Sequence, residues 1–374
     1  MQTLKIQCDG VLEQSLLIQQ QHEIITRMIR YLRFFMLKQQ KNIAFSLARA
    51  MIAVFYRSTI KVMDQISLLG GLLDRAKQCD NINNIRAMNE TVAICLCLVP
   101  EVSQCKDIKG IEQHSRRRFN LEWKKQSNQI IELLANMIRE HPQLQEIGLN
   151  CVAMWLDWSR GISTSDSLTW LVQSSFQYFL ADPSVFSEDT LYAAREVICK
   201  YIVLKATKKD RNALAIVLSQ IVMLDQDIVL SDLECRSQSL AMIIREFTTR
   251  ARITMSNLFE KNEKYMNLLF KFTNCKDSRV VYWTLECWNV LCRQGGIIKK
   301  DAKGVQPLVV QRAIIAIVLS CTFPENWEEE DDDIRTDFYM HRQTVTDCIK
   351  NLVKRADLQW FVTLCKTDLE SGTN

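Results

Sequence analysis

The stretch from Ser278 to Cys292 reads SRVVYWTLECWNVLC. Its mostly apolar positions recur at spacings of four, three, one and three residues, and side chains at these spacings share one face of an α-helix. The residues on that face are Val280, Thr284, Cys287, Trp288 and Leu291. The stretch therefore predicts a helix with one packed face.

The segment from Ser187 shows the same period together with a start signal. Ser187 is a residue type that caps helix N-termini, and Glu188 and Asp189 place negative charge in the first turn, where the helix dipole favours it. The periodic face consists of Leu191, Ala194, Ile198, Tyr201 and Ile202. The sequence thus predicts a second packed helix that begins here.

Composition favours helices throughout the 374 residues. The 10 glycines and 5 prolines are few, compared with usual shares of roughly 7% and 5%. The apolar pattern predicts about sixteen helices. Their boundaries are expected near Gly70-Gly71, Gly110, His141-Pro142, Ser163, Asp182-Pro183, Lys208-Asp210, Asp277, Gly295-Gly296 and Pro324.

Grouped in pairs, these helices recur every ~40 to 47 residues, the period of HEAT and armadillo arrays. We expect an all-α helical-hairpin solenoid in which residues 1–374 form a single array of about eight helix pairs, with no separate catalytic domain. The concave surface of such an array suits extended protein partners. Apolar residues near both ends, at Val11 to Leu17 and Trp360 to Leu364, do not resemble capping repeats, so we expect a fragment or a short isoform.

Charge, cysteines and hydropathy exclude several classes of protein. The formal net charge of +4 is weak for a nucleic-acid-binding protein. The 14 cysteines are scattered through apolar helical segments, which indicates reduced, mostly buried thiols in a cytosolic or nuclear protein. The apolar runs are far shorter than the roughly 20 residues that span a bilayer. We expect a soluble protein without membrane insertion.

Motifs for catalysis are not found in the sequence. None of the four histidines lies at metal-ligand spacing from a cysteine pair, and Cys95 and Cys97 point in different directions on a helix. No nucleophile elbow, phosphate-binding glycine loop or dinucleotide motif is present. We therefore expect no enzyme, no metal and no cofactor.

Four tryptophans lie on strongly periodic helices. They are Trp155, Trp158, Trp283 and Trp288. We expect them to pack in the core; the alternative is an exposed ridge that binds peptides.

Two charged clusters are candidate partner-binding sites. Arg116, Arg117 and Arg118 form either a solvated helix start or a contact for nucleic acid or an acidic peptide, with Phe119 and Trp123 following. The run Glu328, Glu329, Glu330, Asp331, Asp332 and Asp333 repels itself, so it belongs to an exposed loop, expected near residues 325–337, or to a helix start. Such a run either is solvated or steers a basic partner.

Several collinear stretches resemble the transportin-SR and importin-thirteen branch of the importin-beta superfamily. They are Leu98 to Val102, Arg116 to Arg118, Ile130 to Leu134, Cys151 to Trp158, Asp189 to Leu204, Arg245 to Phe247, Asp277 to Leu291, and the acidic run followed by Phe338 to Leu352. The last is the best match, and the set extends from Val92 to Cys365.

The resemblance implies a HEAT-repeat nuclear import receptor that moves between cytoplasm and nucleus. Its implied partners are Ran GTPase in the GTP form, protein cargo that includes serine-arginine-rich proteins, and nucleoporins. It also implies that Glu328 to Asp333 approach a basic patch on Ran. Relative to the family, the first helices and the C-terminal half are missing, which puts full import activity in doubt.

Three alternatives remain open at this stage. One is a HEAT scaffold for a cytosolic complex with no role in transport, and a second is a truncated competitor of the full receptor. An enzyme of a helical class is the third. Dependence on Ran distinguishes transport from scaffolding.

Overall fold

A computed structural model describes residues 2–58, 60–104, 113–181, 185–224, 234–275, 277–293, 314–317, 332–353, 362–363 and 366. Within these ranges the regular elements are helices and no strand occurs. Within each of the two compact units of the chain, the helices pack against their neighbours as in a helical solenoid. The prediction of an all-α fold is therefore confirmed.

Contacts divide the chain into two compact units, residues 1–174 and residues 175–374. The expectation of one continuous array stays a prediction. The first unit contains α1 (Gln2–Leu37), α2 (Lys41–Arg57), α3 (Val62–Lys77), α4 (Ile82–Gln104), α5 (Gln113–Lys125), α6 (Ser127–Glu140), the 3₁₀ turn η1 (Pro142–Leu144), α7 (Gln145–Trp158) and the start of α8 (Asp166–Leu180).

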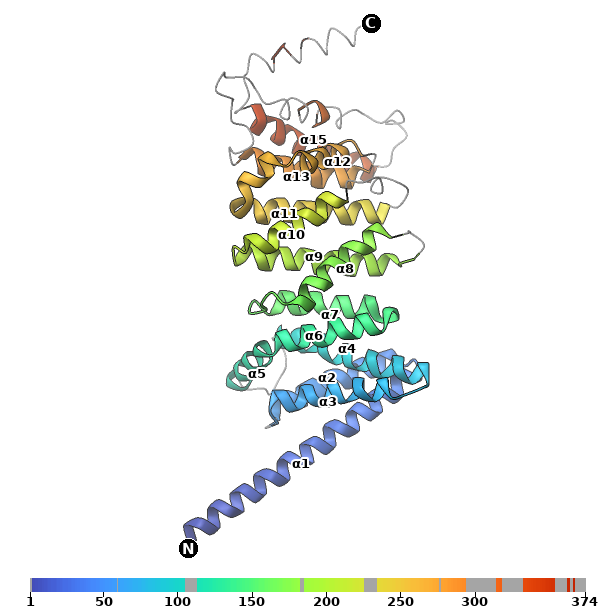
Figure 1. Ribbon diagram of the computed structural model, residues 1–374, viewed down its shortest axis with the longest axis vertical. Helices are drawn as coiled ribbons and strands as arrows, with labels where there is room; N and C mark the ends of the chain where they lie inside the picture. Colours follow the sequence, from blue (N-terminus) through green and yellow to red (C-terminus); the bar gives the residue numbers. More distant parts are fainter. Residues whose placement is uncertain are drawn as a thin grey trace. The chain divides into compact units, whose positions relative to one another are not determined.

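Helix α4 is the centre of the first unit, because it contacts α1, α2, α3 and α7 (Figure 1). Most of its residues from Ala87 to Ser103 are buried, including Val92, Cys95 and Val99. A helix that is apolar on every side needs neighbours on every side. The sequence of α4 thus explains its central position.

A proline inside α4 has its missing hydrogen bond replaced by a tryptophan. Pro100 has no N–H to donate to the carbonyl of Leu96, four residues earlier in the helix. The indole Nε1–H of Trp155 on α7 donates to that carbonyl at a distance of 3.0 Å, and both Leu96 and Trp155 are buried. The proline in α4 and the tryptophan in α7 therefore complement each other.

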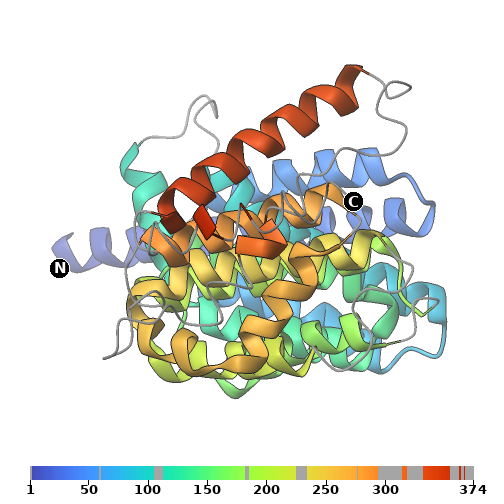
Figure 2. The same ribbon diagram turned by 90° about the horizontal axis from the view of Figure 1, so that it is seen from above.

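The second unit has a regular two-layer arrangement. Its helices are the end of α8, then α9 (Glu188–Thr207), α10 (Arg211–Met223), α11 (Glu234–Lys261), α12 (Glu263–Thr273), α13 (Ser278–Arg293) and α15 (Asp332–Val353). In one layer, α9 packs on α11, α11 on α13 and α13 on α15; in the other, α10 packs on α12 (Figures 1 and 2). Each helix thus contacts the second-next helix along the chain, which is how stacked helical hairpins pack.

Most of the helix boundaries expected within the described ranges are confirmed. Helix α9 starts after Ser187, whose Oγ accepts a hydrogen bond from the Thr190 backbone N–H at 3.2 Å. Helix α10 starts after Asp210, whose Oδ1 accepts from the Ala213 N–H at 3.1 Å. Breaks also occur at His141-Pro142, at Ser163 and at Asp277. Gly110, Asp182-Pro183, Gly295-Gly296 and Pro324 lie outside the described residues.

The boundary expected at Gly70-Gly71 is wrong, since α3 continues through both glycines. A glycine inside a helix costs only about 1 kcal/mol relative to alanine. The neighbouring Leu69 and Leu72 are buried, and their burial offsets a cost of this size. Tertiary packing therefore overrides the local preference for a break.

Candidate functional site

The predicted arginine cluster lies on α5 and is only partly accessible. Arg117 and Arg118 are exposed, whereas Arg116 is half-buried and its Nε has no hydrogen-bond partner. Arg118 lines a small pocket of about 160 Å³ together with Lys61 and Glu122. The cluster therefore offers two accessible guanidinium groups beside a small pocket.

The two aromatic residues that follow the cluster lie in the core. Phe119 and Trp123 are 4% and 0% exposed, and the Trp123 ring contacts the rings of Phe55 and Trp155, with centroids 6.3 and 6.1 Å away. These contacts hold α5 against α2 and α7. Because the rings are covered, they do not provide a stacking surface for bases. The arginine cluster can therefore contact a partner through its charges but not by stacking on bases.

The predicted acidic run lies mostly outside the described residues, which do not include Glu328, Glu329, Glu330 and Asp331. Asp332 and Asp333 are the first residues of α15, so residues 332–337 of the expected loop are helical. Carboxylates in a first helical turn are favoured by the helix dipole. The end of the run is thus a helix start.

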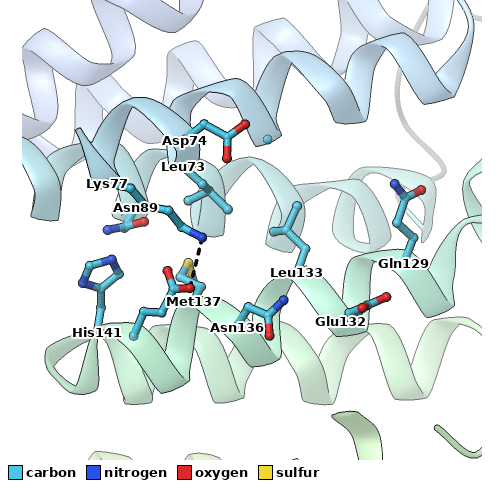
Figure 3. Close-up of a pocket in the computed structure, with 12 residues that line it drawn as sticks. Leu73, Asp74, Lys77, Asn89, Gln129, Glu132, Leu133, Asn136, Met137 and His141 are labelled. Carbon is cyan, nitrogen blue, oxygen red and sulfur yellow. Dashed lines mark ion pairs between the residues drawn. The ribbon is translucent and has the colours of Figure 1, made fainter. Parts of the chain in front are cut away.

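A groove of about 300 Å³ lies between α3, α4 and α6, and we call it the acidic groove (Figure 3). Asp74 and Lys77 line it from α3, and Glu132 and Glu140 line it from α6. His141, directly after α6, lies at one end. The lining thus contains three carboxylates and one ammonium group, and that group pairs with Glu140, since Lys77 Nζ lies 3.0 Å from its Oε1.

Amide side chains complete the polar lining of the acidic groove. Gln129 and Asn136 come from α6, and Asn89 comes from α4. Asn89 is only 1% exposed and its Nδ2 has no hydrogen-bond partner, although a buried polar group normally has one. The Asn89 Nδ2 is a donor and needs an acceptor oxygen from a partner, whereas the carboxylate and amide oxygens of the groove suit cationic side chains and N–H groups.

The sequence could not predict the acidic groove, because its residues are distant in the chain and meet only through helix packing. In the sequence, Gly70 is a residue that could have pointed to the groove, because it lies within a helix and lines the groove. A Cβ added there would meet no atom within 4 Å, so packing inside this chain does not require the glycine. A glycine inside a helical sequence pattern often has a packing or functional reason, and at Gly70 packing does not supply it.

The paired cysteines of α4 belong to the core. Cys95 is fully buried and Cys97 is half-buried. Burial, followed by the neighbouring Cys97, raises the pKa of the Cys95 thiol far above its ordinary value. Burial also raises the pKa of Cys151 on α7, with a hydrogen bond to Cys97 as the next cause. The thiols of Cys95 and Cys151 therefore stay protonated, and hence weakly reactive, at neutral pH.

The tryptophans behave largely as expected. Trp155, Trp158 and Trp288 are at most 7% exposed, which confirms a core position, whereas Trp283 is only half-buried. The Trp288 indole N–H donates to Thr273 Oγ1 at 2.9 Å and so ties α13 to α12. The three buried rings stabilise helix contacts and do not form a binding ridge.

Two further observations concern metals and membranes. In the described part of the chain, no group of three or more histidine, cysteine or acidic residues could hold a metal ion. None of the helices in that part is long and apolar enough to cross a bilayer.

The candidate site thus consists of the acidic groove, on α3, α4 and α6, and the exposed arginines of α5. Neither a protein-family model nor a curated protein matches this chain.

Proposed function

We propose that the chain acts as a nuclear transport receptor of the importin type, which binds cargo protein and the GTP form of Ran and moves between nucleus and cytoplasm. The proposal rests on the collinear resemblance described above. In this proposal the protein is a helical scaffold that binds other macromolecules.

One structural observation carries the proposal furthest. Two of the stretches that resemble the transport receptors, Leu98 to Val102 and Cys151 to Trp158, meet in the core, where Trp155 supplies the hydrogen bond that Pro100 cannot. An unusual proline and its compensating tryptophan thus occur together in the matching stretches. The two stretches thus form one packed unit, as the proposed scaffold requires.

The charges of the acidic groove agree with a basic protein partner. Asp74 and Glu132 are exposed and have no ion-pair partner among the described residues. Exposed charges of this kind accelerate association and are screened beyond a Debye length of about 8 Å at physiological salt. We therefore expect binding that weakens as salt rises.

The test is a pull-down of the purified 374-residue chain with Ran locked in its GTP state and, in parallel, its GDP state, at low and physiological salt. Selective capture of the GTP form supports a transport receptor. Equal capture of both forms, or none by a chain that circular dichroism shows to be folded, contradicts the proposal and favours a scaffold without a transport role.

Variants of the acidic residues then identify which of them contact Ran. We expect the Asp74→Asn/Glu132→Gln double variant to weaken GTP-selective binding at low salt, and charge reversal of residues 328–333 to do the same. Glu146→Gln/Glu263→Gln is the matched control, because it removes two exposed carboxylates outside the groove. If the control and the groove variant weaken binding equally, net charge and not the groove is responsible.

A further inference from the structure

A second groove of about 250 Å³ lies on another face of α3, between α3 and α1. We call it the arginine groove, because Arg30 and Arg33 of α1 and Arg75 of α3 line it. The hydroxyl-bearing Thr26 and Ser67 line it as well. All five residues belong to the first compact unit.

No carboxylate is among the described residues that line the arginine groove. The acidic residues nearest to the lining residues along the chain are Glu23, Asp64 and Asp74. Glu23 pairs with Arg27, Asp74 lines the acidic groove, and Asp64 lines neither groove. Three arginines thus line one groove, and the lining itself supplies no counter-charge. Like charges held close together repel, so this arrangement favours an anionic ligand.

Arg33 is the most constrained of the three arginines. It is half-buried, and its Nε is buried without a hydrogen-bond partner. Arg30 and Arg75 are exposed and form no ion pair within the described part of the chain. A guanidinium group has five N–H donors and no acceptor, so a ligand rich in acceptor oxygens suits the groove.

Gly71 lines the groove from the middle of α3. A Cβ added to it would meet no atom within 4 Å, so no neighbour in the chain requires a glycine at this position. Glycine nevertheless weakens the helix. Its effect here is to keep the groove open, which permits close approach of a ligand.

The lining discriminates between kinds of anion. A single carboxylate has two oxygens, too few for three guanidinium groups and two hydroxyls, whereas a phosphate monoester offers three oxygens and nearly two negative charges. The described lining residues include no aromatic side chain on which a base could stack. The small volume favours a compact ligand over an extended chain.

We propose that the arginine groove binds a compact polyphosphate of the inositol polyphosphate type, either free in solution or as the head group of a phosphoinositide. This site is independent of the proposed binding of Ran. Arg30, Arg33 and Arg75 hold the phosphate oxygens by charge-assisted hydrogen bonds.

The test is isothermal titration calorimetry of the full chain with inositol hexakisphosphate at physiological salt. We expect Arg30→Gln/Arg75→Gln to weaken binding about tenfold or more, because each lost guanidinium removes charge-assisted hydrogen bonds. The matched control is Arg211→Gln/Arg279→Gln, which removes two exposed arginines far from the groove in the sequence. Equal weakening by both pairs would overturn the proposal.

Two glycine variants test the groove without changing any charge. Gly71→Leu places a side chain in the arginine groove, whereas Gly70→Leu, one position earlier in the same helix, places it in the acidic groove. We expect only Gly71→Leu to abolish binding of inositol hexakisphosphate, with circular dichroism unchanged for both variants. Loss in both or in neither contradicts the proposal.

Two further binding assays identify the chemical class of the ligand and show whether it is free in solution or part of a lipid. Binding of a hexa-aspartate peptide as tightly as inositol hexakisphosphate would refute a phosphate site, as would no binding of the latter by the wild-type chain. Co-sedimentation with vesicles that contain phosphatidylinositol 4,5-bisphosphate, but not with phosphatidylserine vesicles, identifies the lipid as the source. Binding of the soluble ligand without co-sedimentation identifies the free polyphosphate.

Discussion

Replacing Trp155 by phenylalanine should expose the dependence of α4 on its interhelical hydrogen bond. The indole N–H is the donor to the buried Leu96 carbonyl, because Pro100 has none to offer. A buried carbonyl left without a partner costs about 1 to 3 kcal/mol. Loss of the larger ring adds a packing cost, so the single variant does not isolate the hydrogen bond.

A double-mutant cycle with Pro100→Ala separates the two costs. Alanine at position 100 restores a backbone N–H for Leu96, and Trp155→Phe should then cost about 1 to 3 kcal/mol less than it does beside the proline. Hydrogen exchange of α4 amides, followed by mass spectrometry, measures this difference, since 1.4 kcal/mol is about tenfold in an opening equilibrium.

The control cycle uses Trp158→Phe, a neighbouring core tryptophan in edge-to-face contact with Trp155, with ring centroids 5.1 Å apart. We expect no coupling between this change and Pro100→Ala. If the Trp155 cycle also shows no coupling, the indole does not replace the bond that the proline lacks, and the explanation of how α4 and α7 fit together is refuted.

Four other substitutions and one change of pH have a defined effect on stability. Gly70→Ala and Gly71→Ala should each stabilise the protein by about 0.5–1 kcal/mol in urea denaturation, because the added Cβ meets nothing within 4 Å. In the same assay Gly148→Ala should destabilise the protein, since its Cβ would lie 2.6 Å from a side-chain atom of α6. Lys209→Gly should stabilise the end of α9 by about 0.5–1 kcal/mol, seen as a higher melting temperature, because φ is 55° there. Burial raises the pKa of the Cys287 thiol from 9.0 to about 12. The contribution of this thiol to the free energy of unfolding is therefore complete below about pH 9 and falls by about 1.4 kcal/mol per pH unit up to about pH 12. Denaturation measured at pH 8–11 would contradict this if stability did not change with pH, or if Cys287→Val left the pH dependence unchanged.

The sequence was sufficient where structure depends on local periodicity. The face predicted from Val280 to Leu291 is buried in α13, and the cap predicted at Ser187 forms its hydrogen bond. Both depend on side chains within one or two turns of each other. Local pattern therefore predicted the packed face and the start of these helices.

The sequence was insufficient where helices distant in the chain meet. The two grooves beside α3 combine residues from α1, α4 and α6, and no local pattern connects Arg33 with Arg75 or Asp74 with Glu132. The Gly70-Gly71 pair was interpreted as a break because isolated helices disfavour it. In the folded unit the same pair lies between the two grooves, one glycine facing each.

The alternation of layers in residues 175–374 determines how many helices can be inserted into or deleted from this unit. Since α9, α11 and α13 share one layer and α10 and α12 share the other, deletion of one helix would move all later helices into the wrong layer and turn their apolar faces outward. Deletion of a hairpin would keep every later helix in its own layer. Viable insertions, deletions or splice variants of this unit should therefore add or remove helices in even numbers.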